Sequence, residues 1–263
     1  MSIGMSNHRQ KLRIWIYLLG VVVVLLVAFH KTEYGGGLGG SELASIWRNS
    51  RIQQRKPRYV FVDLGANRAD SLKTFLEVED AKFKFSFPKP DWATHEQADI
   101  YLFEANPVFN EALVTAKETY QAQGLSITIF PTTVVDVKDG TRTFYLDTVN
   151  GDNDFWGSST NANHPDVVKS GSNGTELSAI NISRWLLMNT LPKDYVVVKM
   201  DIEGSEYDVV PHMVEMGIWS VVDYLFVEWH KNVAGEEAMA RGHAAKDKLI
   251  SKGVQMPSYD SWT

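Results

Sequence analysis

The chain has 263 residues, which allows one large α/β domain with extensions or at most two small domains. Its net charge of −6 at pH 7 disfavours a nucleic-acid-binding surface. Because the sequence contains no cysteine, disulfide scaffolds and cysteine catalysis are excluded, and the redox compartment stays open.

An unbroken apolar run at residues 14–29 dominates the N-terminal region. As a helix rising ~1.5 Å per residue it would span roughly 24 Å, slightly less than the ~30 Å hydrocarbon core, and flanking residues can absorb the difference. Basic residues lie mainly before the run, at Arg9, Lys11 and Arg13, which predicts that the N-terminus stays in the cytosol. A cleaved signal peptide is the alternative, although HKTEYGGG after the run offers no small-x-small cleavage site.

The domain organisation follows from this run. A glycine-rich stretch at 35–40 is typical of a flexible linker, and the folded domain is expected to begin shortly afterwards. The expected boundaries are a cytosolic tail at 1–13, a single transmembrane anchor at 14–30, a stem or linker at 31–56 and a folded domain at 57–263.

The folded domain opens with YVFVDLGANRAD, which predicts a buried strand over residues 59–64. Asp63 lies at its end, and Gly65, Ala66 and Asn67 form a tight turn before a helix. This arrangement is a cradle for a nucleotide cofactor, because glycine lets the backbone approach a ligand and a helix start offers free N–H groups. An ordinary βα turn is the alternative.

Strands and helices alternate along the rest of the domain. Further apolar runs predict strands at 100–104, 125–130, 141–147, 195–201 and 224–230. Helical spacing predicts helices at 69–78, 107–121, 180–191, 205–216 and 236–251. Irregular stretches are expected at 79–98, 134–140 and 150–174. The alternation predicts a mostly parallel, doubly wound sheet.

Acidic residues collect where the predicted strands end, at Asp63, Glu104, Asp201 and Glu228, and His230 follows the last of them. Ligands of an open parallel sheet bind outside the carboxyl ends of its strands, so we expect a ligand site there. Glu104 is placed to accept hydrogen bonds from ribose hydroxyls. Plain helix capping is the alternative for some of these acids.

Five blocks stand in a characteristic order: VFVDLGAN, LFEANP, VVDVKDGTRTFY, VVVKMDIEGSEYDVV and FVEWH. With them the chain resembles the FkbM-type S-adenosylmethionine-dependent methyltransferases over residues 59–230. The resemblance implies the class I, Rossmann-like methyltransferase fold, a mostly parallel seven-stranded sheet with helices on both faces. It also implies S-adenosyl-L-methionine as cofactor and methyl transfer to a hydroxyl, often on a sugar or polyketide. The stretches 79–98 and 161–174 depart from the family pattern, and such loops set the acceptor pocket.

The resemblance further implies a place for each matching residue. The methionine part of the cofactor would lie against Asp63, Gly65, Ala66 and Asn67. The ribose would be held by Glu104, with Ala105 and Asn106 beside it. The adenine would lie near Val135 and Asp136. The floor under the transferred methyl group would be lined by Asp201, Glu203 and Gly204.

Methyl transfer to a hydroxyl requires alignment of the nucleophile and removal of its proton. His230 is the first candidate base because imidazole titrates near neutral pH, and Glu228 could orient it from the same side of the strand. Asp201 or Glu203 is the rival base, and a capping or core role is the alternative for His230. Asp201 and Glu203 could also hold a divalent ion, but two carboxylates alone do not define a metal site, so none is predicted.

An anchor followed by a stem is a layout shared with many glycan-modifying enzymes. By that analogy we expect the folded domain in the lumen of the secretory pathway, in the Golgi, with a glycan or small-molecule acceptor as its partner. Two alternatives stay open. One is a methyltransferase acting on a lipid or small molecule, and the other is a catalytically silent binding module tethered to the membrane.

Overall fold

A computed structural model describes residues 55–153 and 155–259 of the chain. The predicted tail at 1–13, the anchor at 14–30 and all of the stem before residue 55 lie outside these residues. Within the described ranges, no helix has both the length and the apolar character that a bilayer crossing requires.

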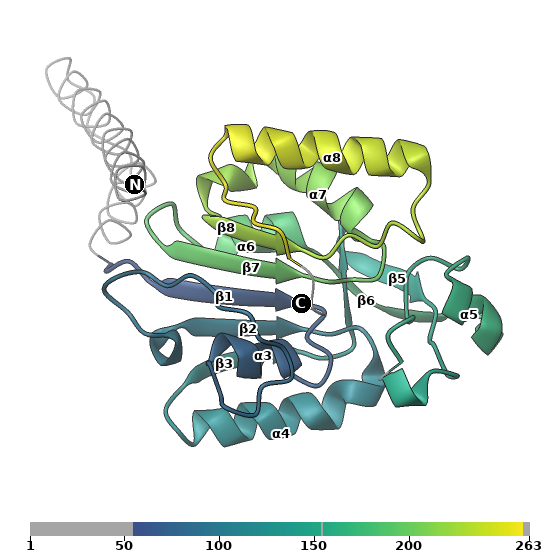
Figure 1. Cartoon of the computed structure of the whole chain (residues 1–263), viewed down its shortest axis with the longest axis horizontal. Helices are drawn as coiled ribbons and strands as arrows, with labels where there is room; N and C mark the ends of the chain where they lie inside the picture. The colour runs from purple at the N-terminus through teal and green to yellow at the C-terminus, as the bar shows by residue number, and fades with distance from the viewer. Residues whose placement is uncertain (1–54, 154, 260–263) are drawn as a thin grey trace, which may run out of the picture. The chain divides into compact units, whose positions relative to one another are not determined.

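Five parallel strands form the central sheet, in the order β3-β2-β1-β7-β8 (Figure 1). Their bounds are β1 Tyr59–Leu64, β2 Asp99–Phe103, β3 Ser126–Phe130, β7 Tyr195–Met200 and β8 Tyr224–Val227. The sheet grows outward in both directions from β1, so the strand order reverses between β1 and β7. That reversal is the place where open α/β sheets bind ligands.

The central sheet therefore has five strands in the described part of the chain, not the seven that the family resemblance implied. Three further strands form a separate sheet in the order β4-β6-β5. They are β4 Thr133–Asp136, β5 Gly140–Phe144 and β6 Thr175–Asn181. After residue 251, the residues that the structure describes add one isolated bridge, between Tyr224 and Gln255, and no strand. Pro257 follows two residues later, and proline lacks the N–H group that a paired strand needs.

Helices cover both faces of the central sheet, as expected (Figure 1). Their bounds are α3 Asp70–Phe75, α4 Asn110–Gln121, α5 Pro165–Ser170, α6 Ile182–Asn189, α7 Glu206–Met216 and α8 Glu236–Ser251. Short 3₁₀ turns are η1 His95–Gln97, η2 Pro107–Phe109, η3 Gly151–Asn153 and η4 Ile218–Ser220. Alternate side chains of β1 point to opposite faces of the central sheet and pack against different helices. Val60 and Val62 pack with α6, α7 and α8, whereas Phe61 packs with α3 and α4.

Three elements differ from the sequence expectation. The expected turn at 134–140 begins as strand β4, and the expected loop at 150–174 contains helix α5 and leads into β6. β6 reads TELSAIN and is buried only at Ala179, so it lacks the apolar run that marks a buried strand. β8 ends at Val227, which places Glu228 and His230 in the loop after the strand and removes the argument from strand parity.

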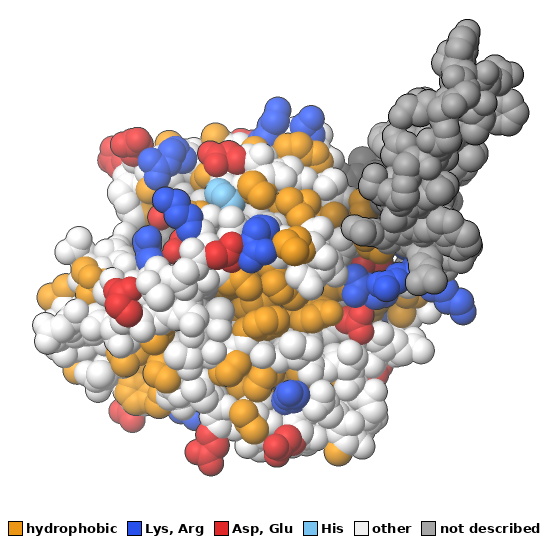
Figure 2. All heavy atoms as spheres, turned by 180° about the vertical axis from the view of Figure 1, so that it is seen from behind, with side chains coloured by type: hydrophobic (Ala, Val, Ile, Leu, Met, Phe, Trp, Pro, Cys, Tyr) orange, Lys and Arg blue, Asp and Glu red, His pale blue; other side chains and the backbone are white. Residues whose placement is uncertain are grey.

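The irregular stretch at 79–98 packs onto the sheet through aromatic side chains. The rings of Phe85 and Phe87 lie 5.2 and 5.3 Å from that of Phe226, and Phe85 also lies 5.2 Å from Tyr259. This contact ties the segment after α8 to the stretch at 79–98. On the face seen in Figure 2, which is turned by 180° from the view of Figure 1, acidic and basic side chains are interspersed around a band of apolar side chains.

Candidate active site

A cavity of about 340 Å³ lies at the carboxyl ends of the central strands, within the size range of small-molecule sites. Most of the predicted site residues line it: Gly65, Ala66, Asn67, Glu104, Ala105, Asn106, Val135, Asp201, Glu203, Glu228 and His230. Asp63, Asp136 and Gly204 are not among its lining residues. Asp63 is fully buried, and the carboxylate of Asp136 accepts a hydrogen bond from the N–H of Val137 at 2.7 Å.

The turn after β1 is held to both neighbouring strands. The N–H groups of Gly65 and Ala66 both donate to the carbonyl of Phe103, at 3.0 and 2.9 Å. Gly65 has φ +85°, and a Cβ there would lie 1.8 Å from the carbonyl oxygen of Asp201. Glycine is therefore required so that the loops after β1 and β7 can meet, beyond any close approach to a ligand.

Replacing Gly65 with alanine is expected to destabilise the fold by at least about 2 kcal/mol, since overpacking costs about 1–3 kcal/mol and a left-handed alanine costs about 1–2 kcal/mol. Gly124→Ala is the matched control, because Gly124 has φ +92° but nothing within 4 Å of an added Cβ. It should lose only the backbone part, about 1–2 kcal/mol. Urea unfolding compares the two variants. Equal losses would show that the backbone at Asp201 moves aside at no cost.

Glu104 joins the turns that follow β1 and β2. Its Oε2 accepts a hydrogen bond from the N–H of Asn67 at 2.8 Å, and its Oε1 accepts one from the N–H of Asn106 at 2.7 Å. Burial raises the pKa of Glu104 to about 7, although the two N–H donors oppose the shift. The side chain forms part of the cavity wall, so its remaining lone pairs can accept hydrogen bonds from a ligand.

Lys199 is a buried cation that the sequence reasoning missed. Its ammonium donates a hydrogen bond to the carbonyl of Gly65 at 2.7 Å and lies 3.2 Å from Asp63 Oδ1 and 3.4 Å from Asp201 Oδ2. Burial alone would lower the pKa of Lys199, but the two carboxylates outweigh it and raise that pKa. Burial raises the pKa of Asp63 to about 6, against the opposing effect of Lys199. Lys199 thus fixes the first turn of the site and balances the charge beneath it.

Asp201, Glu203, Glu206 and His230 form an acid–histidine cluster at one end of the cavity. Glu206 is fully buried and accepts hydrogen bonds from the N–H groups of Ile202 and Gly204, at 2.8 and 2.9 Å. Its Oε1 lies 3.1 Å from Nδ1 of His230. A carboxylate only accepts hydrogen bonds, so Nδ1 carries the proton. Glu206 therefore occupies the orienting position that the sequence suggested for Glu228.

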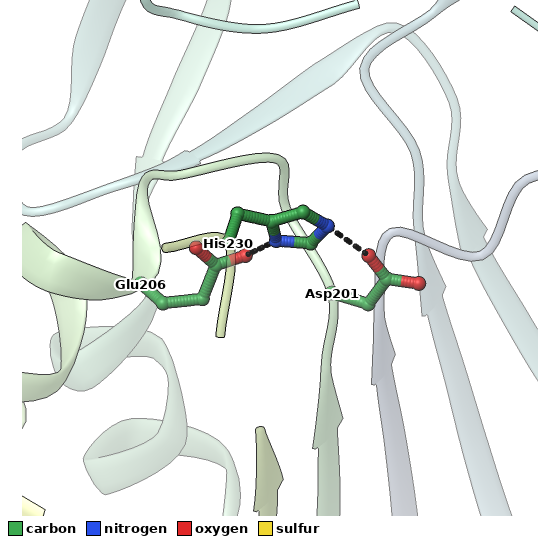
Figure 3. A group of neighbouring side chains, drawn as sticks. All are labelled: Asp201, Glu206 and His230. Atoms are coloured by element: carbon green, nitrogen blue, oxygen red, sulfur yellow. Dashed lines mark hydrogen bonds and ion pairs between the residues drawn. The ribbon is translucent and has the colours of Figure 1, made fainter. Parts of the chain in front are cut away.

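The other ring nitrogen of His230 faces two carboxylates. Figure 3 shows the imidazole between Glu206 and Asp201, and Nε2 lies 3.8 Å from Asp201 Oδ1 and 3.4 Å from Glu203 Oε2. Burial lowers the pKa of His230, but the hydrogen bond that its Nδ1 donates to Glu206 and the surrounding negative charges outweigh it and raise the pKa to about 10. At neutral pH the chain by itself thus favours the protonated imidazole.

His164 supports Glu203 from the other side. Its Nδ1 accepts a hydrogen bond from the N–H of Asp166 at 3.2 Å, at the start of α5. Nε2 therefore carries the proton of the neutral ring, and it lies 3.6 Å from Glu203 Oε2. The side chain of His164 is buried. Burial raises the pKa of Glu203, whereas His164 and His230 both oppose that shift.

The stretch at 147–160, here called the 147–160 loop, contributes Phe155, Trp156, Gly157, Ser158 and Thr160 to the wall of the cavity. Asp147 holds the loop together, since its carboxylate accepts hydrogen bonds from the backbone N–H groups of Val149, Asn150 and Gly157 and from the side chains of Asn150 and Ser170. The Oγ of Ser158 accepts a hydrogen bond from Nδ2 of Asn106 at 3.0 Å, and the Oγ of Ser159 donates one to the carbonyl of Glu203 at 2.7 Å. The loop therefore contacts both ends of the cavity.

Comparison with known proteins gives one finding. The family model for the methyltransferase FkbM domain matches residues 63–251, a range that includes all the cavity-lining residues. No curated protein and no solved structure matches the chain. Because the family model covers well over half of the chain, the chain belongs to the FkbM methyltransferase family.

Proposed function

We propose that this protein transfers a methyl group from S-adenosyl-L-methionine to a hydroxyl group, and that the acceptor is a glycan. One observation carries the proposal. A single cavity at the reversal of strand order joins Glu104, suited to ribose hydroxyls, to the acid–histidine cluster, suited to proton removal. Family membership supports methyl transfer, and the chemistry of the cavity walls supports the choice of donor and acceptor.

The cavity fits the proposed cofactor on three counts. Glu104 offers carboxylate lone pairs to the ribose. Within the described part of the chain, Oδ1 of Asn67 is buried without a hydrogen-bond partner, and Asn67 lines the cavity. Phe103 and Val135 give the wall near Glu104 an apolar surface suited to adenine. When bound, the cofactor supplies a methyl group on a positively charged sulfur, and the negative cluster favours that charge.

The residues of the cluster serve the acceptor. Aligning its oxygen behind the methyl carbon supplies much of the rate, and a proton acceptor contributes ~10²–10⁴-fold. Nε2 of His230 and the carboxylate of Glu203 lie 3.4 Å apart, so either can reach one acceptor hydroxyl. His230 is the first candidate, with its ring fixed by Glu206. Glu203 and Asp201 are the alternative bases. Their negative charges favour the protonated form of His230, which has no free electron pair to accept a proton, whereas a carboxylate does.

A glycan acceptor is supported by the opposite wall of the cavity and by the N-terminal sequence. Phe155 and Trp156 line the cavity beside polar groups, a combination that suits the apolar face and hydroxyl rim of a sugar ring. The apolar run at 14–29, with basic residues before it, supports a retained anchor and a lumenal, Golgi domain. A lipid or small-molecule acceptor and a silent binding module are the competing functions.

Calorimetric titration of the full-length protein with S-adenosyl-L-methionine and with its demethylated product tests the proposal. We expect saturable binding of both, and then methyl transfer to at least one acceptor in a screen of methylatable sugars. If the folded protein binds neither compound, the methyltransferase proposal fails and the binding module replaces it. Binding of both with transfer only to lipids would overturn the glycan assignment alone.

His230→Ala is expected to slow methyl transfer ~10²–10⁴-fold while cofactor affinity stays the same. The variant loses the group that removes the proton but keeps the contacts of Glu104 with the ribose. His243→Ala is the matched control, since His243 is an exposed histidine on α8. Single-turnover transfer and calorimetry measure the two effects. Unchanged turnover in His230→Ala would move the base role to Glu203 or Asp201.

A further inference from the structure

We propose that the acid–histidine cluster binds a divalent transition-metal ion between Nε2 of His230 and the carboxylates of Asp201 and Glu203. The site stands on the side chains themselves, and only its role in catalysis rests on the proposed function. It goes beyond the sequence reasoning, which found two carboxylates and no further ligand. The structure adds an imidazole from a loop 27 residues further along the chain than Glu203.

The first argument is convergence. Asp201, Glu206 and His230 each place a ligand atom within 4.8 Å of the others. Nε2 of His230 lies 3.4 Å from Glu203 Oε2 and 3.8 Å from Asp201 Oδ1. Ligand bonds of ~2.0–2.2 Å separate adjacent ligand atoms by roughly 3.0–3.5 Å, so each of these two carboxylate oxygens lies near the distance from Nε2 that a shared ion requires.

The second argument is the support of the imidazole. Histidines that bind metals almost always donate their other ring N–H to a carboxylate or carbonyl group, which fixes the tautomer. Glu206 provides that support, because its Oε1 accepts from Nδ1 of His230. Both oxygens of Glu206 also accept backbone N–H groups, from Ile202 and Gly204. Glu206 is therefore the outer partner of the ligand, and an ion bound at Nε2 would replace the proton that this nitrogen otherwise carries toward Asp201 and Glu203.

The third argument is that the two oxygens of Asp201 face different partners, and that the cluster carries excess negative charge. Oδ2 lies 3.4 Å from the ammonium of Lys199, and Oδ1 faces His230. Lys199 also has Asp63 at 3.2 Å, so one buried ammonium is shared between two carboxylates. Glu203 and Glu206 add two more carboxylates close by, so the four carboxylates outnumber the two cations, Lys199 and the protonated His230. A divalent cation at Nε2 supplies the missing positive charge.

The ligand chemistry selects the kind of ion. Ca²⁺ and Mg²⁺ prefer oxygen ligands only, whereas one imidazole with two carboxylates suits Mn²⁺, Fe²⁺ or Zn²⁺. His164 is excluded as a ligand because its Nδ1 accepts a backbone N–H, which leaves a proton on Nε2. It instead donates toward Glu203 and holds that carboxylate in place. Three protein ligands leave positions open toward the cavity.

An ion at this place has a defined role in the proposed reaction. The acceptor hydroxyl would occupy an open position on the ion, which lowers the pKa of that hydroxyl, and its proton leaves to solvent. In this arrangement His230 acts as a ligand and takes the place of a base. An oxygen electron pair then forms the new O–C bond to the methyl group. The C–S bond breaks, and its electron pair stays on sulfur, which becomes a neutral thioether.

Manganese titration followed by electron paramagnetic resonance tests the site. The full-length protein is stripped with chelator, dialysed and titrated with MnCl₂, and the signal of free Mn²⁺ counts the bound ions. We expect one ion per chain. His230→Ala and Asp201→Asn should each weaken binding at least tenfold, and Glu206→Gln should weaken it ~10–100-fold through the lost support of the imidazole. His243→Ala should bind as wild type does. Circular dichroism identifies any variant that fails to fold, and the Mn²⁺ affinities of the remaining variants then test the site.

Two results would overturn the proposal: no Mn²⁺ bound at millimolar concentration, or equal affinity in wild type, His230→Ala and Asp201→Asn. In either case the cluster is an ion-paired imidazolium. Titration of the cofactor into stripped protein separates this failure from that of the proposed function. Cofactor binding and methyl transfer by protein that binds no metal would refute only the metal site. Mn²⁺ binding without cofactor binding would refute only the proposed function.

Discussion

Replacing Lys199 with methionine is expected to lower the free energy of unfolding by about 3–5 kcal/mol, the usual cost of removing one partner from a buried ion pair. The side chain of Lys199 is 2% exposed and that of Asp63 is not exposed at all, so solvent cannot take over the neutralisation of Asp63. The variant also loses the hydrogen bond to the carbonyl of Gly65, which holds the turn at the head of the cavity. Urea unfolding followed by circular dichroism measures the loss.

Two further variants make this result specific. Lys169→Met removes an ammonium from an exposed pair with Asp166 on α5, and surface pairs contribute ~0–1 kcal/mol, so little change is expected. Adding Asp63→Asn to Lys199→Met removes the uncompensated buried charge and should recover part of the loss. A loss under about 1 kcal/mol in Lys199→Met would mean that water or a rearranged partner reaches Asp63.

The affinity for S-adenosyl-L-methionine is expected to fall by up to tenfold for each unit of pH below about 7 and to reach a plateau above about 8. The cause is Glu104, whose pKa is about 7 because of burial. Its ionised form accepts hydrogen bonds from ribose hydroxyls, whereas the protonated form offers fewer acceptor sites. As the pH falls through the pKa, the protein must release a proton before it binds. Calorimetry between pH 6.5 and 8 measures this slope, above the pKa of about 6 for Asp63.

Glu104→Gln identifies the group responsible. The amide does not titrate, so its pH profile should be flat across this window. Its affinity at pH 8 should be lower by ~1–3 kcal/mol, since one side-chain acceptor becomes a donor and buried groups lose their partners. Glu118→Gln changes an exposed glutamate on α4 and should keep both the affinity and the slope of wild type. A slope that persists in Glu104→Gln would assign it to another group in the cavity.

The central sheet could be predicted because its signal is local. Runs such as YVFVDL and YVVVKM are buried on both faces, and their composition alone marks them as strands. β4 and β6 could not be predicted in the same way, because TVVD and TELSAIN are short or polar and depend on pairing with each other and, for β6, with β5. The seven-stranded sheet was wrong because it came from the family resemblance and not from runs in this sequence.

The loops that line the cavity could also be predicted, because parallel strands bring their carboxyl ends to one edge. The supporting residues could not, since their roles depend on distant contacts. Glu206 looks like an ordinary residue in the first turn of α7, and only the fold brings it to His230. Lys199 did leave a signal, since a lysine inside an otherwise apolar strand needs a buried partner. The neighbouring strand offers Asp63 in register with it.

The hydrogen bonds of Asp147 have a consequence for how this family can diversify. They close the base of the 147–160 loop through its backbone, so the frame of the loop does not depend on the side chains at its tip. Ser158 and Ser159, beyond that tip, keep the contacts with the cofactor end and with Glu203. Under the proposed function, residues between Thr148 and Trp156 can therefore change with the acceptor while the contacts of Ser158 and Ser159 stay in place.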